Sequence, residues 1–253
     1  MLVRADWLKY NRTMKKELIR KRFAKSLPTY EKSAIVQEIM ADNIIKALPE
    51  RKYTNILELG CGCGLLTKKI VNSISYKTYD AVDMVEECEK YLSQISSDIN
   101  FIVQDLEQFS TDKKYDLIIS NASFQWLENL PEFIKNIKNY LKKDGIFVFT
   151  IFGKENYKEI TKVMKTSLKY YSSDEIRNIC SDYEIIKISD EIKVLNFDSP
   201  IDVLHHIKNT GVNALSQTHW TKSDLQNFSD EYNSVCDGNI TLTYNPVYVV
   251  LKR

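Results

Sequence analysis

Three glycines at alternating positions, preceded by a glutamate, form the clearest chemical signal in the chain. Residues 56–64 read Ile-Leu-Glu-Leu-Gly-Cys-Gly-Cys-Gly, so Gly60, Gly62 and Gly64 follow Glu58 at even spacing. Glycine lets a backbone approach a ligand more closely than any Cβ would permit. Because the chain has only seven glycines, three within five positions predict a ligand-binding loop rather than an ordinary tight turn.

Two ligand classes compete for such a loop. A dinucleotide site needs Gly-x-Gly-x-x-Gly/Ala, with the pyrophosphate on the N-terminus of the following helix. Here the third small position of that pattern is Leu65, and the third glycine comes one place earlier, at Gly64. The carboxylate of Glu58 would repel a pyrophosphate and would suit a positive group. These residues favour a ligand with a positive charge over a dinucleotide.

This loop resembles the first motif of the class I S-adenosylmethionine-dependent methyltransferases, Asp/Glu-x-Gly-x-Gly-x-Gly. The resemblance implies that the loop binds S-adenosyl-L-methionine and that methyl transfer leaves S-adenosyl-L-homocysteine. It also implies a carboxylate at the end of the second strand, which accepts hydrogen bonds from the ribose hydroxyls. Asp83, followed by Met84, lies 19 residues after Gly64 and is the residue we expect there, with Asp80 as the alternative.

A third carboxylate is expected after the third strand, against the adenine amino group. Asp105, Leu106 and Phe109 match the family's Asp-Leu/Ala-x-x-Phe pattern at this place. Gln37 and Asn121 complete the residues that we expect to bind the cofactor. Each acid alone is consistent with a strand-end residue facing water, but three in register favour a nucleoside site.

The fourth strand ends beside the glycine loop, in the sequence Ser-Asn-Ala-Ser-Phe-Gln-Trp at residues 120–126. Backbone carbonyls and aromatic faces at that edge would stabilise a sulfonium cation. The alternative for Phe124 and Trp126 is packing in the core.

Four segments are similar to one branch of the family, the malonyl-acyl-carrier-protein O-methyltransferases that open pimeloyl synthesis for biotin. They are Phe23-Ala24-Lys25-Ser26-Leu27-Pro28-Thr29-Tyr30 with Gln37 beyond it, residues 120–126, residues 205–213, and Leu242-Thr243-Tyr244. The similarity covers nearly the whole chain, with one departure: Cys63 stands where many relatives have Thr or Ser. It implies O-methylation of the free carboxylate of a malonyl thioester, with malonyl-acyl carrier protein or malonyl-coenzyme A as substrate.

Two alternatives remain, because the first motif does not select the acceptor. One is a methyltransferase for another small carboxylic acid or metabolite. The other is a non-catalytic binding subunit with the methyltransferase fold, against which the intact loop and its three acids speak.

A malonyl carboxylate is already deprotonated at pH 7, so its methylation needs no general base. The site must instead hold the carboxylate in place and exclude water. We expect Tyr30, Gln125 and His206 to be the catalytic residues, with His205 and Lys208 as further substrate contacts. Trp126 is expected at the substrate as well. The alternative for the two histidines is a position on the surface of a helix.

The N-terminal 25 residues form a basic arm or helix, with nine basic side chains and two acidic ones, although the whole chain has a net charge of only +1. Acyl carrier protein is acidic, so we expect it to dock on this arm at Lys16, Arg20 and Arg22. The alternative is a solvated or partly disordered arm. Because the basic charge is confined to one end and no base-pocket motif follows the fourth strand, we expect no nucleic-acid substrate.

The composition is that of an ordinary globular chain, with 43% apolar and 27% charged residues. No apolar stretch approaches the roughly 20 residues that span a bilayer, so we expect no membrane partner. The five scattered cysteines lack the spacing of a zinc site, and their odd number without a signal peptide predicts reduced thiols in the cytoplasm. We expect a monomer without a metal.

Strand and helix patterns alternate along the first half of the chain. Apolar runs predict strands at 53–59, 77–83, 99–103, 115–120 and 146–152, and helices at 30–48, 65–71, 85–95 and 130–141. This alternation predicts an α/β fold with a doubly wound, mostly parallel sheet. The family resemblance implies seven strands in a Rossmann-like order.

Beyond Gly153 the pattern changes, with helices expected at 155–169, 173–180, 200–208 and 222–235 and strands at 183–197 and 240–251. The resemblance implies that these two strands form a final β-hairpin. Residues 198–239 would then be a helical lid inserted before the last strand, at the edge of the sheet where the cofactor lies. We expect one methyltransferase domain at 26–253, preceded by the arm of residues 1–25.

Overall fold

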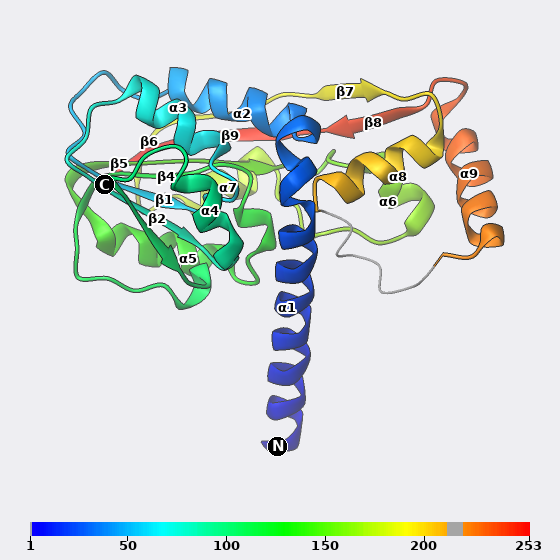
Figure 1. Ribbon diagram of the computed structural model, residues 1–253, viewed down its shortest axis with the longest axis horizontal. Coiled ribbons are helices and arrows are strands. Elements are labelled where there is room, and N and C mark those ends of the chain that lie inside the picture. The colour runs from blue at the N-terminus through cyan, green and yellow to red at the C-terminus, as the bar shows by residue number, and fades with distance from the viewer. Residues whose placement is uncertain (1, 212–219) are drawn as a thin grey trace.

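A seven-stranded sheet forms the centre of the computed structural model, which describes residues 2–211 and 220–253, with side chains from Lys16 onward (Figure 1). Its strand order is β3-β2-β1-β4-β5-β9-β6. The strands are β1 (Asn55–Leu59), β2 (Thr78–Asp83), β3 (Ile99–Val103), β4 (Tyr115–Ser120), β5 (Leu141–Phe152), β6 (Glu184–Asp190) and β9 (Pro246–Lys252). All neighbours pair in parallel except β9, which runs antiparallel between β5 and β6. The predicted fold class, a doubly wound and mostly parallel sheet, is confirmed.

Helices cover both faces of this sheet, with α2 and α3 on one face and α5 on the other (Figure 1). The α-helices are α1 (Leu2–Ser33), α2 (Ile35–Lys46), α3 (Leu65–Ser73), α4 (Glu89–Leu92), α5 (Leu130–Ile137), α6 (Lys158–Met164), α7 (Ser173–Ile179), α8 (Pro200–Asn209) and α9 (Lys222–Cys236). Short 3₁₀ turns are η1 (Glu86–Cys88), η2 (Leu106–Gln108), η3 (Phe124–Trp126) and η4 (Lys138–Tyr140).

Alternate residues of each central strand enter one of two hydrophobic cores. Ile56 of β1 packs with Ile44 of α2 and Ile70 of α3 in one core. Its neighbour Leu57 packs in the other core, which also contains Ile134 of α5. Because successive strand residues point to opposite faces, a strand covered on both sides reads as a continuous apolar run.

Two predicted long strands are each broken into two, so the single hairpin expected from 183–197 and 240–251 is wrong in detail. β6 pairs with β9 in the main sheet, whereas β7 (Lys193–Asn196) and β8 (Thr241–Tyr244) form a separate two-stranded ribbon. Asn245 separates β8 from β9, and its side-chain amide donates to the Glu191 carbonyl at 3.0 Å. Its own carbonyl accepts from the Gly153 amide at 2.7 Å. These hydrogen bonds take the place of regular strand pairing at the point where the chain passes from the ribbon into the main sheet.

The helical insertion expected before the last strand is present as α8 and α9, which lie between β7 and β8. Val203 of α8 and Phe228 of α9 are buried with Leu242 and Tyr244 of β8 and with Ile160 of α6. This third core joins the insertion to the ribbon (Figure 1).

The first helix differs from the prediction, because α1 runs without a break from Leu2 to Ser33. No structural boundary therefore falls at residue 25, and the next helix begins at Ile35 rather than Tyr30. Ala34, with φ −83° and ψ 44°, interrupts the helical path between them. The N-terminal end of α1 extends away from the rest of the molecule, and its C-terminal half lies against it (Figure 1).

Two other predicted helices are shorter than expected. The one at 85–95 is reduced to η1 and α4, and the one at 155–169 is reduced to α6. Tyr157 and Lys165 flank α6 with φ of 56° and 52°. Left-handed backbone cannot continue a right-handed helix, so these residues set its limits.

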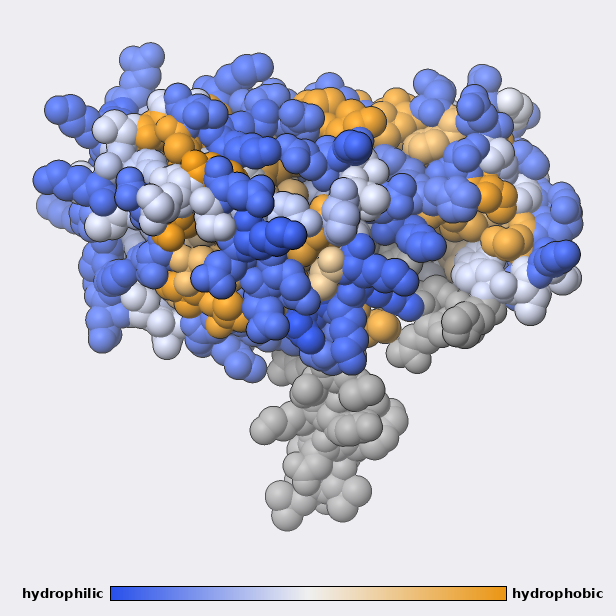
Figure 2. Space-filling model, viewed as in Figure 1, coloured by the Kyte–Doolittle hydropathy of each residue, from blue (hydrophilic) through white to orange (hydrophobic). Residues whose placement is uncertain are grey.

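Hydrophilic side chains cover most of the face shown in Figure 2, with apolar side chains visible between them. None of the helices in the described part of the chain has both the length and the apolar character needed to cross a bilayer. All five cysteines lie in that part and all are free thiols. Within the same residues, no three His, Cys, Asp or Glu side chains meet in a way that could hold a metal ion.

Candidate active site

A cavity of about 1190 Å³, including the space at its mouth, opens at the carboxyl ends of β1, β2 and β4. The sheet supplies its floor, α1 supplies one wall, and Thr210 and Gly211 at the end of α8 supply another part. This is the edge where parallel sheets of doubly wound folds bind their ligands. The position agrees with the edge that the glycine loop indicated.

The glycine loop joins β1 to α3 by backbone geometry that only glycine adopts easily. Gly60 has φ +73°, and a Cβ built on it would lie 2.0 Å from Oγ and 2.5 Å from Cβ of Ser123. The amides of Gly60 and Cys61 both donate to the Val82 carbonyl. Gly60 and Gly62 line the cavity.

Gly64 has a different place from the other two glycines. It precedes α3 with φ +83°, and a Cβ on it would lie 2.3 Å from Cδ1 of Ile95. It is not among the cavity-lining residues. Its small size serves the packing of the loop against the segment that follows α4.

Glu58, the acid of the loop motif, is 1% exposed and lines the cavity. Its Oε2 accepts from the Thr67 hydroxyl at 2.6 Å and from the Tyr79 hydroxyl at 2.5 Å. Burial raises the pKa of Glu58 to about 7, against which these two hydrogen bonds act. A positive group placed beside this carboxyl group would lower its pKa, because the opposite charge stabilises the ionised form.

Asp83, at the end of β2, is buried and holds the glycine loop in place. Its Oδ2 accepts from the Gly62 amide at 2.9 Å, and its Oδ1 accepts from the Val85 amide at 3.0 Å. Burial raises the pKa of Asp83, although these backbone hydrogen bonds oppose the shift. Asp83 and Met84 line the cavity, whereas Asp80 bonds with Lys113 and Tyr115 outside it. The structure thus favours Asp83 over Asp80 as the acid at the site.

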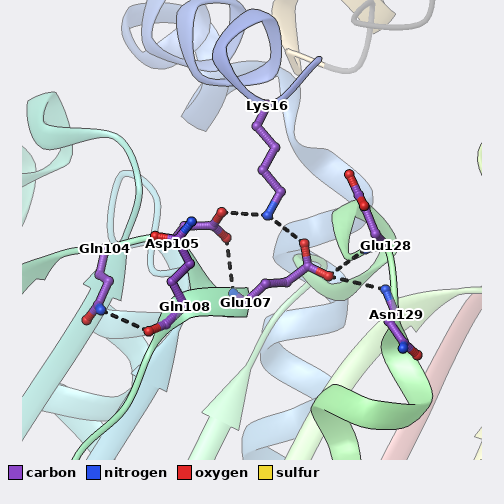
Figure 3. A network of polar contacts seen from close by, with 7 residues as sticks. All are labelled: Lys16, Gln104, Asp105, Glu107, Gln108, Glu128 and Asn129. Atoms are coloured by element: carbon purple, nitrogen blue, oxygen red, sulfur yellow. Dashed lines mark hydrogen bonds and ion pairs between the residues drawn. The ribbon is translucent and has the colours of Figure 1, made fainter. Parts of the chain in front are cut away.

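Asp105, Glu107 and Lys16 form a polar network at the cavity (Figure 3). The ammonium of Lys16 lies 2.5 Å from Oδ2 of Asp105 and 2.5 Å from Oε2 of Glu107. Oδ1 of Asp105 accepts from the Glu107 amide at 3.0 Å. Oε1 of Glu107 accepts from the amides of Glu128 and Asn129, at 3.0 Å and 3.2 Å. The network joins α1 to the loops that follow β3 and β4, and Leu106 lies within it on the cavity wall.

Two amide side chains present unpartnered oxygens at the cavity. Oε1 of Gln37 and Oε1 of Gln125 are buried without a hydrogen-bond partner. Asn121 donates to the Gln37 carbonyl at 3.0 Å and accepts from the Thr150 hydroxyl at 2.7 Å. All three of these side chains line the cavity. A buried acceptor without a donor is costly, so both oxygens call for a ligand that supplies N–H or O–H groups.

Tyr30 and Trp126 supply aromatic surface at the cavity. The ring of Tyr30 packs edge-on against that of Phe23, with centroids 5.2 Å apart. Burial raises the pKa of Tyr30, so its hydroxyl stays a neutral donor. Phe124, by contrast, is buried in the core among Phe133, Phe147 and Phe149, as one alternative predicted.

The basic residues predicted on the lid do not line the cavity. His205 and Lys208 are exposed on α8. His206 is half-buried, and its Nε2 lies 2.6 Å from the Tyr244 hydroxyl, which in turn accepts from Tyr157 at 3.1 Å. Burial lowers the pKa of His206, so the ring is neutral near pH 7.

The arm residues divide between the cavity and the outer surface of α1. Lys16 and Arg20 line the cavity, and Arg20 also bonds with Glu17. Arg22 does not line it. Lys21 and Lys25 are exposed on the outer side of the helix.

Some lining residues were not predicted, notably Ile19, Phe23, Glu107, Thr210 and Gly211. Gly211 has φ +73°, and a Cβ on it would lie 2.9 Å from Oγ of Ser26 on α1. The resemblance segments at 23–30 and 205–213 contain three of these residues, but nothing in them indicates that they meet. Residues 212 and 213 of the second segment lie outside the described part of the chain.

The cavity suits a nucleoside with a cationic amino-acid group. Carboxylates end or follow three neighbouring strands, at Glu58, Asp83 and Asp105, and the orphaned oxygens of Gln37 and Gln125 add further acceptors. Such acceptors match hydroxyl, amino and ammonium donors and would repel phosphate. The residues present therefore match the donor set of S-adenosyl-L-methionine.

Comparisons with known proteins agree with this description. A family model described as a methyltransferase domain matches residues 33–184. A malonyl-[acyl-carrier protein] O-methyltransferase from Chlorobium luteolum is 36% identical over 251 residues, which cover 94% of this chain and 95% of the relative. Another from Porphyromonas gingivalis is 35% identical, covering 95% and 97%.

Solved structures share the fold at low sequence identity. A Bacillus halodurans protein described as a putative methyltransferase has a TM-score of 0.64 at 14% identity, covering 84% of this chain and 97% of that one. An N-methyltransferase from Bradyrhizobium japonicum, solved with S-adenosyl-L-homocysteine, has a TM-score of 0.53 at 14% identity, covering 89% and 98%. At these identities the likeness establishes the fold alone.

Proposed function

The chain belongs to the methyltransferase-domain family and, within it, to the malonyl-[acyl-carrier protein] O-methyltransferases, and from that premise we propose that it methylates the free carboxylate of a malonyl thioester. The acyl group would be carried by acyl carrier protein. The observation that carries the proposal is the similarity, over nearly the full length, to relatives named for this activity. The cavity is consistent with it, because three strand-end acids line it together with Tyr30 and Gln125.

S-adenosyl-L-methionine is the proposed methyl donor, and it supplies an electrophilic methyl group on a sulfonium. We propose that Gly60 and Gly62 allow its close approach, with Gly64 shaping the loop from outside the cavity. Asp83 would accept from the ribose hydroxyls and Asp105 from the adenine amino group. The remaining contacts are proposed at Gln37, Glu58, Met84, Leu106 and Asn121, all of which line the cavity.

The proposed reaction forms one bond and breaks one. A carboxylate oxygen bonds to the methyl carbon while the sulfur–methyl bond breaks, and its electron pair remains on sulfur in S-adenosyl-L-homocysteine. No proton moves, because the carboxylate is ionised at pH 7. The cavity needs no general base, and its residues act by positioning the oxygen and by excluding water.

Tyr30 and Gln125 are the proposed contacts to the carboxylate. Tyr30 lines the cavity, and burial raises the pKa of its hydroxyl, which therefore stays protonated. Nε2 of Gln125 donates one hydrogen to the Ala122 carbonyl at 2.5 Å, and a primary amide has a second hydrogen to donate. Trp126 would cover the acyl chain from the same loop. Hydrogen bonds to a charged acceptor are stronger than neutral ones, so two donors suffice to orient the group.

His206 takes a supporting place in this proposal, since it does not line the cavity. It contacts Tyr244, which accepts from Tyr157, and Tyr157 lies close enough to Tyr30 to help raise its pKa. His206 would thus position the tyrosine side of the cavity. His205 and Lys208 were predicted as substrate contacts, but both are exposed on α8 and away from the cavity, so we propose that they contact the carrier protein instead of the carboxylate.

Acyl carrier protein is acidic, and the outer side of α1 offers exposed lysines at Lys21 and Lys25. We propose that these residues, with Arg22, receive the carrier. Reversing the charge of Lys21 and Lys25 to glutamate would raise KM for the carrier substrate at low salt and leave KM for malonyl-coenzyme A unchanged. Equal KM values for the carrier substrate in both proteins would remove α1 from the docking site.

The main test is methyl transfer from isotopically labelled S-adenosyl-L-methionine to malonyl-acyl carrier protein. Malonyl-coenzyme A and free malonate serve as alternative acceptors, and acetyl-acyl carrier protein, which lacks the carboxylate, is the matched control. The expected product is a labelled methyl ester on the malonyl group alone. Label on free malonate but not on the thioesters would favour a small-acid methyltransferase, and label on no acceptor would reject the activity.

A further inference from the structure

Helix α1 covers the cavity along one of its faces. Lys16, Ile19, Arg20, Phe23 and Tyr30 all line the cavity, and the first four stand at positions i, i+3, i+4 and i+7, on one side of the helix. This side of α1 therefore separates the cavity from solvent over at least two helical turns. A ligand as large as a nucleoside cannot pass through this face while the helix stays in place.

The two ends of this segment are attached in different ways. At the C-terminal end, Leu27 is buried with Cys63, Val85 and Cys88, so apolar packing fixes it. The same end contacts the lid, where Gly211 lies against Phe23 and Ser26. Packing of this kind is lost only when the helix leaves the body of the protein.

Among the side chains that the structure describes, a polar attachment lies nearer the N-terminus of α1. The ammonium of Lys16 bridges Asp105 and Glu107 at 2.5 Å each (Figure 3). The three side chains are 15–20% exposed, so the ion pairs are partly accessible to solvent. An ion pair in such a setting is weakened by salt and can open without disturbing a core.

Glu107 makes the bridge more than a surface contact. Its other carboxylate oxygen accepts from the amides of Glu128 and Asn129, which lie in the loop before α5. Lys16 thus connects α1 to the loop after β3 directly and, through Glu107, to the loop after β4. Asp105 keeps a second lone pair on Oδ2, so it can accept from a ligand while Lys16 stays bound.

We propose that Lys16 is a latch that holds α1 closed over the cavity and so sets the rates at which the methyl donor and its product enter and leave. This inference rests on the proposed function for the identity of the ligand. Lys16 acts through the position of α1 and has no part in the methyl transfer itself. We predicted Lys16 as a contact to the carrier protein, whereas in this proposal it holds α1 and thereby controls access of the cofactor to the cavity.

The test is stopped-flow binding of S-adenosyl-L-homocysteine to the full chain, comparing wild type with Lys16→Met. Lys21→Met is the matched control, because Lys21 lies on the same helix, is 67% exposed and pairs only with Glu17 among the described side chains. S-adenosyl-L-homocysteine has no net charge near pH 7, so salt acts on the latch rather than on steering of the ligand. Measurements are made at low and high sodium chloride.

We expect Lys16→Met to raise both the association and the dissociation rate by about threefold or more, as befits a partly exposed double ion pair. Added salt should speed both rates in the wild type and in Lys21→Met, and should leave Lys16→Met unchanged. Lys16→Arg, which keeps the charge, should restore slow exchange.

Equal association rates in wild type and Lys16→Met, with both proteins binding, would overturn the latch and leave the proposed function intact. An increase in the dissociation rate alone would also overturn it, because it would mean that Lys16 holds the ligand rather than the helix. If the wild type binds no S-adenosyl-L-homocysteine at any salt concentration, both proposals fail.

Discussion

The backbone N–H of Gly62 donates to Oδ2 of Asp83 at 2.9 Å, and this hydrogen bond ties the glycine loop to the end of β2. The other oxygen of the same carboxylate accepts from the Val85 amide. One buried side chain thus fixes the loop and faces the cavity. The shape of the loop and the proposed acceptor for the ribose hydroxyls depend on a single residue.

Replacing Asp83 with Asn should destabilise the protein and weaken ligand binding. An amide has one acceptor oxygen, so one of the two backbone N–H groups would lose its partner, at a cost of roughly 1–3 kcal/mol. Urea unfolding measures this loss, and calorimetry should show S-adenosyl-L-homocysteine bound about tenfold more weakly or worse. Asp98→Asn, at an exposed position, is the control. Equal stability of the two variants would show that Asp83 does not hold the loop.

Gly60→Ala should abolish or strongly weaken cofactor binding, whereas Gly238→Ala should not. Both glycines have left-handed φ, +73° and +96°, so both substitutions carry a backbone cost of about 1–2 kcal/mol. Only at Gly60 does the new Cβ also meet Ser123, where even the Cβ atom is 2.5 Å away and rotation of the side chain gives no relief. At Gly238 nothing lies within 4 Å. Affinity for S-adenosyl-L-homocysteine is compared between the two variants under conditions where their stabilities match, which separates the clash with Ser123 from the backbone strain. Similar affinities of the two variants would refute the clash.

Glu58→Gln should remove a pH dependence of stability between about pH 4.5 and pH 7. The folded protein holds a proton on Glu58 up to a pKa of about 7, but the unfolded chain releases it near the ordinary value of 4.5. Raising the pH through this window therefore favours unfolding, by about 3 kcal/mol in order of magnitude.

Urea unfolding near pH 5 and near pH 8 checks this prediction. The wild type should lose more stability than Glu58→Gln over this interval, and Glu89→Gln, at an exposed position, should behave as the wild type does. The titration of His206 acts in all three proteins and cancels in the comparison. Parallel pH profiles of wild type and Glu58→Gln would mean that the carboxyl is already ionised at pH 5.

Tyr30→Phe should impair the use of the malonyl acceptor without affecting the donor. Loss of a hydrogen bond to a charged carboxylate costs roughly 1.5–3 kcal/mol, which lowers kcat/KM about 10-fold to 100-fold. The dissociation constant of S-adenosyl-L-homocysteine should change by less than about twofold. Tyr53→Phe is the control, since its hydroxyl donates to the Pro49 carbonyl at 2.8 Å away from the cavity. A loss confined to donor binding would remove Tyr30 from the acceptor site.

The central strands and the acids at their ends could be predicted because they depend on local patterns, whereas the order of the strands in the sheet was implied by the family resemblance. Each strand is an apolar run, and each parallel strand ends at the same edge, so Asp83 and Asp105 fall into place once the strands are known. The breaks at Asn245 and Glu191 could not be predicted, because the flanking residues continue the strand pattern. At the break, the side-chain amide of Asn245 donates to the Glu191 carbonyl, 54 residues away in sequence, and the Glu191 amide donates to the Pro246 carbonyl.

The walls of the cavity were harder to predict than its floor. Lys16 and Asp105 are 89 residues apart in sequence, and no pattern within either segment indicates that they meet. The same is true of Gly211 and Ser26. His206 has the expected helix and residue type, but the contact with Tyr244 directs it away from the cavity. Such placements follow from how whole elements pack, and periodicity does not encode them.

The breaks between β6 and β7 and between β8 and β9 determine how the helices α8 and α9 are attached to the sheet. Because β6 leads into β7 and β8 leads into β9, the ribbon that carries α8 and α9 extends directly from the sheet. Hydrogen bonds of Asn245 hold this junction. Tilting the ribbon relative to the sheet would strain the backbone of β9, which pairs with β5 and β6 inside the sheet. Resistance to such tilting would keep Thr210 and Gly211, which line the cavity at the end of α8, at a constant distance from the carboxyl edge of the sheet.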